Sequence, residues 1–345
     1  MAGSANSFGI LASAAYLPRW RIERRTVTDA VGWARGRVRP GQGTRSFAHW
    51  DEDSLTLAVE AGRGIHLADS PPARLLLAST SLPFADRSNA GIVREALGLP
   101  ASTQLLESGG SRRAATSALI EALEAGLPTL LCASVCVDAQ PGSDGETELG
   151  HGAAAVLLGD GEAAAEPLAW ATRSSDFVDR YRQTDQRFDY RLEARWARDA
   201  GIRGPLKALI GDVLENAGVE AENIHYCLAG LPLAVSRVVA RDAGLADAEL
   251  LADVEAEIGL CGAAQPLVLL DRALAQAEAG QLILVIGAGQ GFDVLLFRAT
   301  GRGRRDLIPP PARLEPNYAR YLGLRRLIDI DGGLRAERDN RSAQS

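Results

Sequence analysis

The stretch EALEAGLPTLLCAS, residues 121–134, has a counterpart in ALAQAEAGQLILVIGA, residues 273–288. In both, apolar residues at helical spacing run up to a glycine, Gly126 or Gly280, and an apolar strand follows. Each strand is a continuous apolar run, which is typical of a strand buried on both faces. A repeat this long exceeds a solenoid period, so it predicts two copies of one α/β half-domain.

The same order of elements extends outward from this repeat. In the first half we expect a helix at 113–127 and strands at 74–80, 128–137 and 152–161. In the second half we expect a helix at 264–280 and strands at 224–232, 281–289 and 292–300. The chain therefore divides into an N-terminal half, 1–165, a C-terminal half, 166–300, and a tail, 301–345.

Two segments lie outside the repeat. Residues 171–200 are rich in Arg and Asp, and their charge run 177–199 is typical of a solvated or interfacial surface. The tail has three consecutive prolines and an excess of Arg over acidic residues. Its stretch NYARYLGLRRLI, 317–328, carries apolar side chains that a solvated tail would not need. It predicts a segment that docks on a partner through Tyr318, Tyr321, Leu322, Leu324 and Arg325.

Composition excludes several classes of function. A net charge of −7 over 345 residues argues against a general nucleic-acid binder, because phosphate affinity comes from clustered Lys and Arg. We find no signal peptide and no window with the roughly 20 apolar residues of a membrane span, and expect a cytoplasmic protein. The four Cys and four His lack metal-ligand spacing, so we expect no metal site. Cys132 and Cys136, four apart on a strand, should share one buried face.

The stretch LESGGSRRAATSAL, residues 106–119, has the form of a small-residue turn leading into a helix. Such a turn can present a reactive thiol at a helix N-terminus, where the dipole lowers the thiol pKa. Here the corresponding positions read Ser111 and Arg112. Ser111 fits an N-cap of helix 113–127. Arg112 is a cation at a helix N-terminus, so it needs a carboxylate, a ligand anion or an interface partner.

Several segments, taken in order, carry a family resemblance: GILASAAYLPRWRIERRTV (9–27), WDEDSLTLAVEAG (50–62), ASTSLPFADRSNAGIVREALGLP (78–100), PGSDGETELGHGAAAVLLGDG (141–161) and NYARYLGLRRL (317–327). Together they resemble HMG-CoA synthase-like proteins of the thiolase superfamily, alongside ketoacyl-ACP synthase III. The resemblance implies the α/β thiolase fold, with duplicated βαβαβαββ halves in five α/β/α/β/α layers and two five-stranded sheets. It also implies a dimer and chemistry on acyl thioesters.

The resemblance further implies where the family's reactive groups would lie. In the family a Cys takes the acyl group, a His transfers protons, an Asn polarises the thioester oxygen, and HMG-CoA synthases add a Glu. These roles fall, in that order, on Arg112, Gly230, Leu260 and Thr80. None of the four positions holds the residue type that the family uses there. Inserting one residue moves the Cys position to Ser111. No covalent cofactor is implied, and residues that would bind a cofactor remain unassigned.

Ser111 and Cys261 are the remaining nucleophile candidates. His225, five residues before Gly230, would lie at the far end of its strand and could not easily activate Ser111. Cys261 has no basic partner in view. The stretch GAGQG, 287–291, leads from strand to strand and so fails the context of a dinucleotide loop; the resemblance implies that two backbones pass closely there. His151 stands where the family usually has Asp, and we expect it to be structural.

The resemblance therefore implies a catalytically degenerate subunit, a pseudoenzyme. It would pair with an active thiolase-like subunit and an OB-fold zinc-ribbon protein, in a dimer or larger heteromer. That complex would transfer acyl groups, or make or break C–C bonds, on CoA thioesters. An alternative is an acyl-CoA acyltransferase, lyase or hydrolase without a covalent Cys, rebuilt around Ser111, Arg112 or Cys261. A third is a protein that binds thioesters without turnover.

Overall fold

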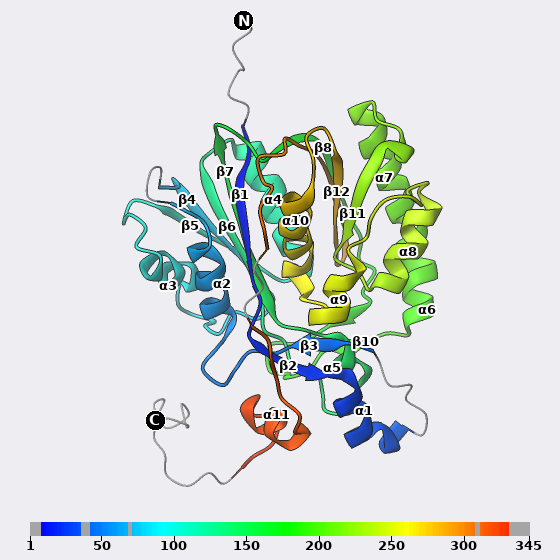
Figure 1. The fold of residues 1–345 in the computed structure, drawn as a ribbon. Coiled ribbons are helices and arrows are strands. Elements are labelled where there is room, and N and C mark those ends of the chain that lie inside the picture. Colours follow the sequence, from blue (N-terminus) through cyan, green and yellow to red (C-terminus); the bar gives the residue numbers. More distant parts are fainter. Residues whose placement is uncertain (1–7, 36–41, 68–70, 308–310, 331–345) are drawn as a thin grey trace, which may run out of the picture.

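The computed structural model describes residues 8–35, 42–67, 71–307 and 311–330. The first residues of the predicted N-terminal half and residues 331–345 of the predicted tail lie outside this set. Figure 1 shows two sheet regions with helices between them and on both outer sides. This is the thiolase fold, with the α/β/α/β/α layering expected from the sequence.

Nine strands form one mixed sheet in the order β11-β12-β13-β8-β1-β7-β6-β4-β5. The first half contributes β1 Phe8–Tyr16, β4 Arg74–Ala78, β5 Gln104–Ser108, β6 Thr129–Val135 and β7 Gly152–Asp160. The second half contributes β8 Ala165–Ser174, β11 Ile224–Ala229, β12 Leu282–Ala288 and β13 Gly291–Ala299. The two halves join through one strand pair, Ile10 with Ala165.

Six helices form the other layers (Figure 1). The middle layer is α4 Ala114–Ala125 and α10 Gln265–Gln276, which contact each other and strands of both halves. The outer layers are α2 Ser54–Arg63 with α3 Asn89–Ala96, and α7 Arg203–Ala217 with α8 Leu233–Asp242. The largest apolar cluster packs around the middle layer, because most residues of α4 and α10 are buried.

The repeat seen in the sequence is present, with two differences. Helix α4 ends at Gly126, which adopts the left-handed conformation expected of a helix-ending glycine. Helix α10 instead ends at Ala277 in extended conformation, and Gly280, with φ +90°, belongs to the turn before β12. The fifth strand expected in the second sheet is reduced, among the described residues, to an isolated bridge between Tyr226 and Glu249.

Shorter elements complete the chain. The strands are β2 Trp20–Glu23, β3 Thr44–Ser46 and β14 Arg313–Leu314, which form a small sheet, and the hairpin pair β9 Arg180–Tyr181 and β10 Tyr190–Arg191. The helices are α1 Arg24–Val31, α5 Asp144–Glu148, α6 Ala194–Trp196, α9 Ala252–Ile258 and α11 Tyr318–Leu324. A π-helix spans Ala197–Ile202, and 3-10 turns span Gly32–Arg35, Ala221–Asn223 and Gly262–Ala264. Within the described ranges, no helix is both long and apolar enough to cross a membrane.

The tail docks on its own chain. Tyr321 is fully buried, and Leu322 packs with it against Ile22 and Phe47 of the small-sheet region. Arg325 pairs with Asp138. The predicted anchors therefore do anchor a segment, but the surface that Tyr321, Leu322 and Arg325 occupy is intramolecular. Leu324 is only partly buried, as is Tyr318, whose hydroxyl donates to the Glu146 carboxylate.

Candidate functional site

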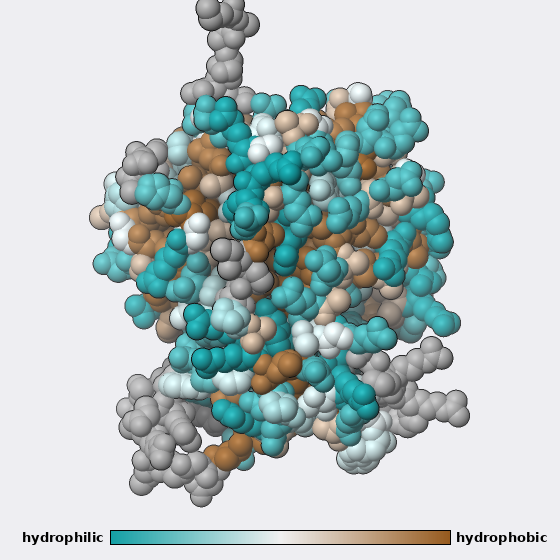
Figure 2. Space-filling view, in the orientation of Figure 1, coloured by the Kyte–Doolittle hydropathy of each residue, from teal (hydrophilic) through white to brown (hydrophobic). Residues whose placement is uncertain are grey.

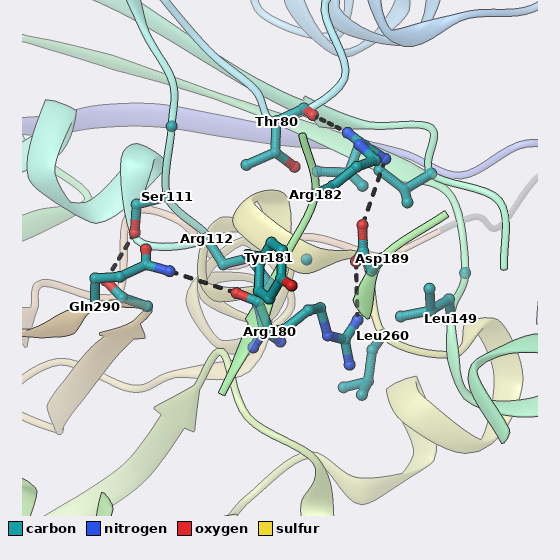
Figure 3. A pocket seen from close by; sticks show the side chains of 16 residues that line it. Thr80, Ser111, Arg112, Leu149, Arg180, Tyr181, Arg182, Asp189, Leu260 and Gln290 are labelled. Atoms are coloured by element: carbon teal, nitrogen blue, oxygen red, sulfur yellow. Dashed lines mark hydrogen bonds and ion pairs between the residues drawn. The ribbon is translucent and has the colours of Figure 1, made fainter. Parts of the chain in front are cut away.

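A cavity of about 200 Å³ lies where the two halves meet, next to the turn before α4 (Figure 3). Both halves contribute to its wall. The lining residues are Thr80, Gly110, Ser111, Arg112, Val135, Val137, Leu149, Gly150, Arg180, Tyr181, Arg182, Asp189, Leu260, Gly262, Gly289 and Gln290. The wall is therefore apolar in one part and strongly cationic in another.

The turn before α4 positions Ser111 differently from the expected N-cap. The helix starts at Ala114 and its N-cap residue is Arg113, which makes no side-chain cap. Ser111 lies two residues earlier, because residues 111–113 form a turn in which the Ala114 amide donates to the Ser111 carbonyl. The Ser111 hydroxyl donates to the Gly289 carbonyl at 2.7 Å and accepts from the Arg113 amide at 3.3 Å.

The glycine loop 287–291 passes very close to this turn, as expected. A Cβ on Gly289 would lie 2.7 Å from the Ser111 hydroxyl oxygen and 2.9 Å from the Arg112 nitrogen. A Cβ on Gly287 would lie 1.8 Å from Thr116 Oγ1, inside α4. Only glycine permits this approach of two backbones.

Arg113 at the start of α4 is neutralised by a carboxylate from the other half. Its guanidinium donates to the fully buried Asp293 of β13 at 2.8 Å. Thr116, Ser117 and Thr172 also donate to Asp293, at 2.6–2.8 Å. This network compensates a cation that would otherwise oppose the helix dipole. It also holds residues 111–113, called the nucleophile turn below because the resemblance places the family's Cys there, against the second half.

Arg112 also finds a carboxylate within the chain. It forms an ion pair with Asp179, and both side chains are mostly buried. The sequence left three kinds of partner open, and Asp179 is one of them, an intrachain carboxylate. Arg112 thus lines the cavity with part of its charge already compensated.

The β9–β10 hairpin places charged side chains in the cavity, where the sequence analysis expected a solvated or interfacial surface. That expectation is wrong for Arg180, which is 8% exposed, and for Asp189. Asp189 lies 3.5 Å from both Arg180 and Arg182. Arg182 also donates to the Thr80 carbonyl at 2.6 Å. The sequence carried little signal for this placement, because β9 contains only Arg180 and Tyr181.

Three of the four positions that the resemblance assigns to reactive groups meet at this cavity. Thr80, Arg112 and Leu260 line it, together with Ser111. Gly230 does not; it follows β11 and donates its amide to the Ile286 carbonyl. Cys261 points away and is fully buried, and burial raises the pKa of its thiol to about 12.

His225 also stays apart from the turn. It lies near the start of β11, and its ring nitrogen accepts from the Leu282 amide. This contact lies at the opposite end of the strand from Gly230, as expected. The imidazole therefore has no access to the Ser111 hydroxyl.

A second polar cluster, which the sequence analysis missed, lies beyond β6. Strand β6 ends at Val135, so Cys136 lies just beyond the strand and is only partly buried, although it packs against the same apolar cluster as the buried Cys132. The Cys136 sulfur lies 3.3 Å from Arg325 and 3.6 Å from the His151 ring. His151 in turn lies 3.6 Å from Asp138. The order Cys–His–Asp superficially resembles a nucleophilic triad.

This cluster has a structural role, because both nitrogens of the His151 ring already have backbone hydrogen-bond partners. Nδ1 accepts from the Ala48 amide at 2.9 Å, and Nε2 is 3.1 Å from the Val137 carbonyl, to which it donates. Burial, then the charge of Arg325, lowers the pKa of His151 to about 3. Burial raises the pKa of Cys136 to about 11. A neutral thiol beside so weak a base makes a poor nucleophile.

No set of three or more His, Cys, Asp or Glu side chains among the described residues is placed to hold a metal ion. Gln290 completes the cavity wall, and its side-chain amide is 3.5 Å from the Arg180 carbonyl. The site as built thus holds guanidinium groups, one carboxylate and apolar side chains. Such a set can bind an anion or an acyl chain.

No family model matches the chain. It is 23% identical to the hydroxymethylglutaryl-CoA synthase of Caldivirga maquilingensis over 355 residues, covering 94% of this chain and 99% of that protein. It is 28% identical to the hydroxymethylglutaryl-CoA synthase of Aeropyrum pernix over 347 residues, covering 96% and 94%.

Solved structures share the fold. An HMG-CoA synthase crystallised with CoA superposes with a TM-score of 0.74 at 17% identity, over 86% of this chain and 83% of that one. The 3-oxoacyl-(acyl carrier protein) synthase III of Pseudomonas aeruginosa gives 0.71 at 21% identity, over 88% and 100%.

Proposed function

Because the chain is a distant homologue of hydroxymethylglutaryl-CoA synthases in the thiolase superfamily, we propose that it is a catalytically degenerate subunit of a thiolase-fold complex acting on acyl-CoA. It does no covalent chemistry itself. Its partner is a thiolase-like subunit with an intact reactive Cys. A small OB-fold zinc-ribbon protein completes the complex, and the CoA thioester is the substrate of the whole.

The observation that carries this proposal is the make-up of the cavity beside the nucleophile turn. Thr80, Arg112 and Leu260 occupy it at the positions where the resemblance expects Glu, Cys and Asn. Arg112 and Leu260 can neither attack a thioester nor transfer a proton from an acyl group. None of the described residues lining the cavity is Cys, His, Glu or Asn.

The contacts of the two fallback nucleophiles weigh against an independent enzyme. The Ser111 hydroxyl gives its hydrogen to the Gly289 carbonyl, and a carbonyl cannot act as the base that a serine nucleophile requires. Cys261 is fully buried with a raised pKa, so its thiolate is scarce. Ser111 thus lines the cavity without a base, and Cys261 is not among the residues that line it.

An open sheet edge supports the pairing part of the proposal. Strand β5 ends the nine-stranded sheet and pairs only with β4 in the described structure. Its central residue, Leu106, is 38% exposed. An unpaired sheet edge with an exposed leucine can pair with another chain. We place the thiolase-like partner here.

The tail supports the position of the second partner. Beyond its own docking contacts it leaves Leu314, Ile328 and Ile330 exposed. Figure 2 shows apolar surface at the lower edge of the molecule, in the region of α11. We place the OB-fold protein on this surface, beside the intramolecular anchor Tyr321.

The test is purification of the tagged chain from its native cells, as wild type, Leu106→Lys and Leu127→Lys. Leu127 is the matched control, an exposed leucine in the loop between α4 and β6. We expect a Cys-containing thiolase-fold protein to accompany the wild type and Leu127→Lys in equal amounts, but not Leu106→Lys. Recovery of the chain alone, with acyl-CoA turnover that Ser111→Ala abolishes, would instead establish the independent enzyme.

A further inference from the structure

Three guanidinium groups face one small cavity. Arg112, Arg180 and Arg182 all line the cavity beside the nucleophile turn (Figure 3). We propose that this cavity binds, without covalent chemistry, the carboxylate group of a short aliphatic molecule. This inference goes beyond the role of a degenerate subunit and does not depend on it, because the isolated chain contains every residue involved.

The positive charge is not fully compensated. Arg112 is paired with Asp179, whereas Arg180 and Arg182 share one carboxylate, Asp189, at 3.5 Å each. Arg182 has a further partner in the Thr80 carbonyl. With three cations against two carboxylates, one positive charge remains. A single carboxylate from a ligand would balance it.

Arg180 is the group that most requires a ligand. It is 8% exposed, and its Nε–H is buried without a hydrogen-bond partner among the residues described. Its side chain extends towards Asp189 and Leu260 (Figure 3). A buried donor left unsatisfied is costly, and a buried charge more so. Burial, then Arg112, lowers the pKa of Arg180, which fits a cation short of negative charge.

The shape and lining favour a carboxylate on a short carbon chain. The guanidinium fork matches a planar carboxylate through two parallel hydrogen bonds. Val135, Val137, Leu149 and Leu260 form an apolar wall that suits a few methylene groups. The volume of about 200 Å³ corresponds to roughly seven waters, enough for a small acid and too little for a nucleotide.

The carboxylate can come from two sources. One is a free short-chain acid, and the other is the distal carboxylate of a dicarboxylic acyl thioester whose remaining part lies outside the cavity. The two share the same recognition by Arg180 and the same apolar wall. They differ in whether the part of the molecule outside the cavity adds affinity. A titration with both kinds of ligand distinguishes them.

The experiment is isothermal titration calorimetry on the full chain with butyrate, succinyl-CoA, acetyl-CoA and inorganic phosphate. We expect saturable one-to-one binding of butyrate or succinyl-CoA, and weaker binding of acetyl-CoA and phosphate. Tighter binding of succinyl-CoA than of butyrate identifies the thioester source, and the reverse identifies the free acid. Absence of saturable binding by both carboxylates, or phosphate binding as tightly as the better of them, would overturn the proposal.

Two variants and a control assign the binding to the cavity. Arg180→Met should lower affinity at least tenfold, while its thermal unfolding midpoint should change little, because the variant removes a buried Nε–H that has no partner and leaves Arg182 beside Asp189. Leu260→Trp keeps every arginine but fills the cavity, so it should also lose binding. Arg198→Gln, which removes a partly exposed arginine paired with its neighbour Asp199 outside the cavity, should bind as wild type does. Equal affinity in Arg180→Met and Arg198→Gln would refute the assignment.

Discussion

Arg325 in the tail donates two hydrogen bonds to the carboxylate of Asp138, at 2.9 and 3.1 Å, across 187 positions of the chain. The same guanidinium donates to the Ala48 carbonyl at 2.8 Å. Both members of the pair are largely buried. The tail is therefore tied to the segment that follows β6, directly behind the wall of the cavity.

Removing Arg325 should unfold the tail region and destabilise the whole chain. Arg325→Leu leaves the Asp138 carboxylate buried without its partner, which should cost about 3–5 kcal/mol of unfolding free energy. Urea denaturation followed by circular dichroism measures this. The control is Arg302→Leu, because Arg302 and Glu162 are both exposed, and it should cost about 1 kcal/mol or less. Equal losses in the two variants would show that the tail is not held by this pair.

His151 should make the protein less stable as the medium becomes acidic. The folded chain keeps this ring neutral down to about pH 3, whereas an unfolded His takes up a proton near pH 6.5. The stabilisation is therefore complete above pH 6.5 and is lost as pH falls towards 3. Between pH 6.5 and 5 the loss should be about 2 kcal/mol.

The measurement is the unfolding free energy at pH 7, 6 and 5 for wild type, His151→Asn and His49→Asn. Asn removes the titrating ring, so the first variant should lack about 2 kcal/mol of the acid-induced loss. His49→Asn, the same substitution at a partly exposed residue in the same region, is the comparison variant. Parallel slopes for all three proteins would contradict a buried neutral His151.

How far the sequence could predict this structure depends on how local each signal is. The repeat and the helix end at Gly126 were predictable, because helical spacing and a left-handed glycine act within a few residues. The predicted helix end at Gly280 was wrong, because the positive φ of Gly280 belongs to the turn before β12 and α10 ends earlier. Arg180 was missed because strands of two residues are too short to show a period. The Arg325–Asp138 pair has no local signal at all.

The close approach of the glycine loop to α4 gives a steric prediction. Gly287→Ala puts a methyl group 1.8 Å from Thr116 Oγ1, so the backbone or the helix must move. We expect a loss of about 3 kcal/mol in unfolding free energy. Gly211 lies within α7 with nothing near its Cβ position, and Gly211→Ala should stabilise by up to about 1 kcal/mol. Similar denaturation midpoints for the two variants would mean that the loop and α4 are not in contact.

Thiol reactivity offers a direct measure of whether any cysteine retains nucleophilic character. Burial raises the pKa of Cys132, Cys227 and Cys261 to about 12, and that of Cys136 to about 11. At pH 8 folded Cys136 should react with iodoacetamide about a hundredfold more slowly than a free thiol, and the other three more slowly still, since the thiolate is the reacting form. Cys136, the only one of the four that is not fully buried, should be alkylated first.

In denaturing urea all four should react at the rate of a free thiol, which serves as the control. Mass spectrometry of the digested protein assigns each site. Rapid alkylation of folded Cys261 would reveal an activated thiol, and the degenerate-subunit proposal would then give way to an enzyme rebuilt around that residue.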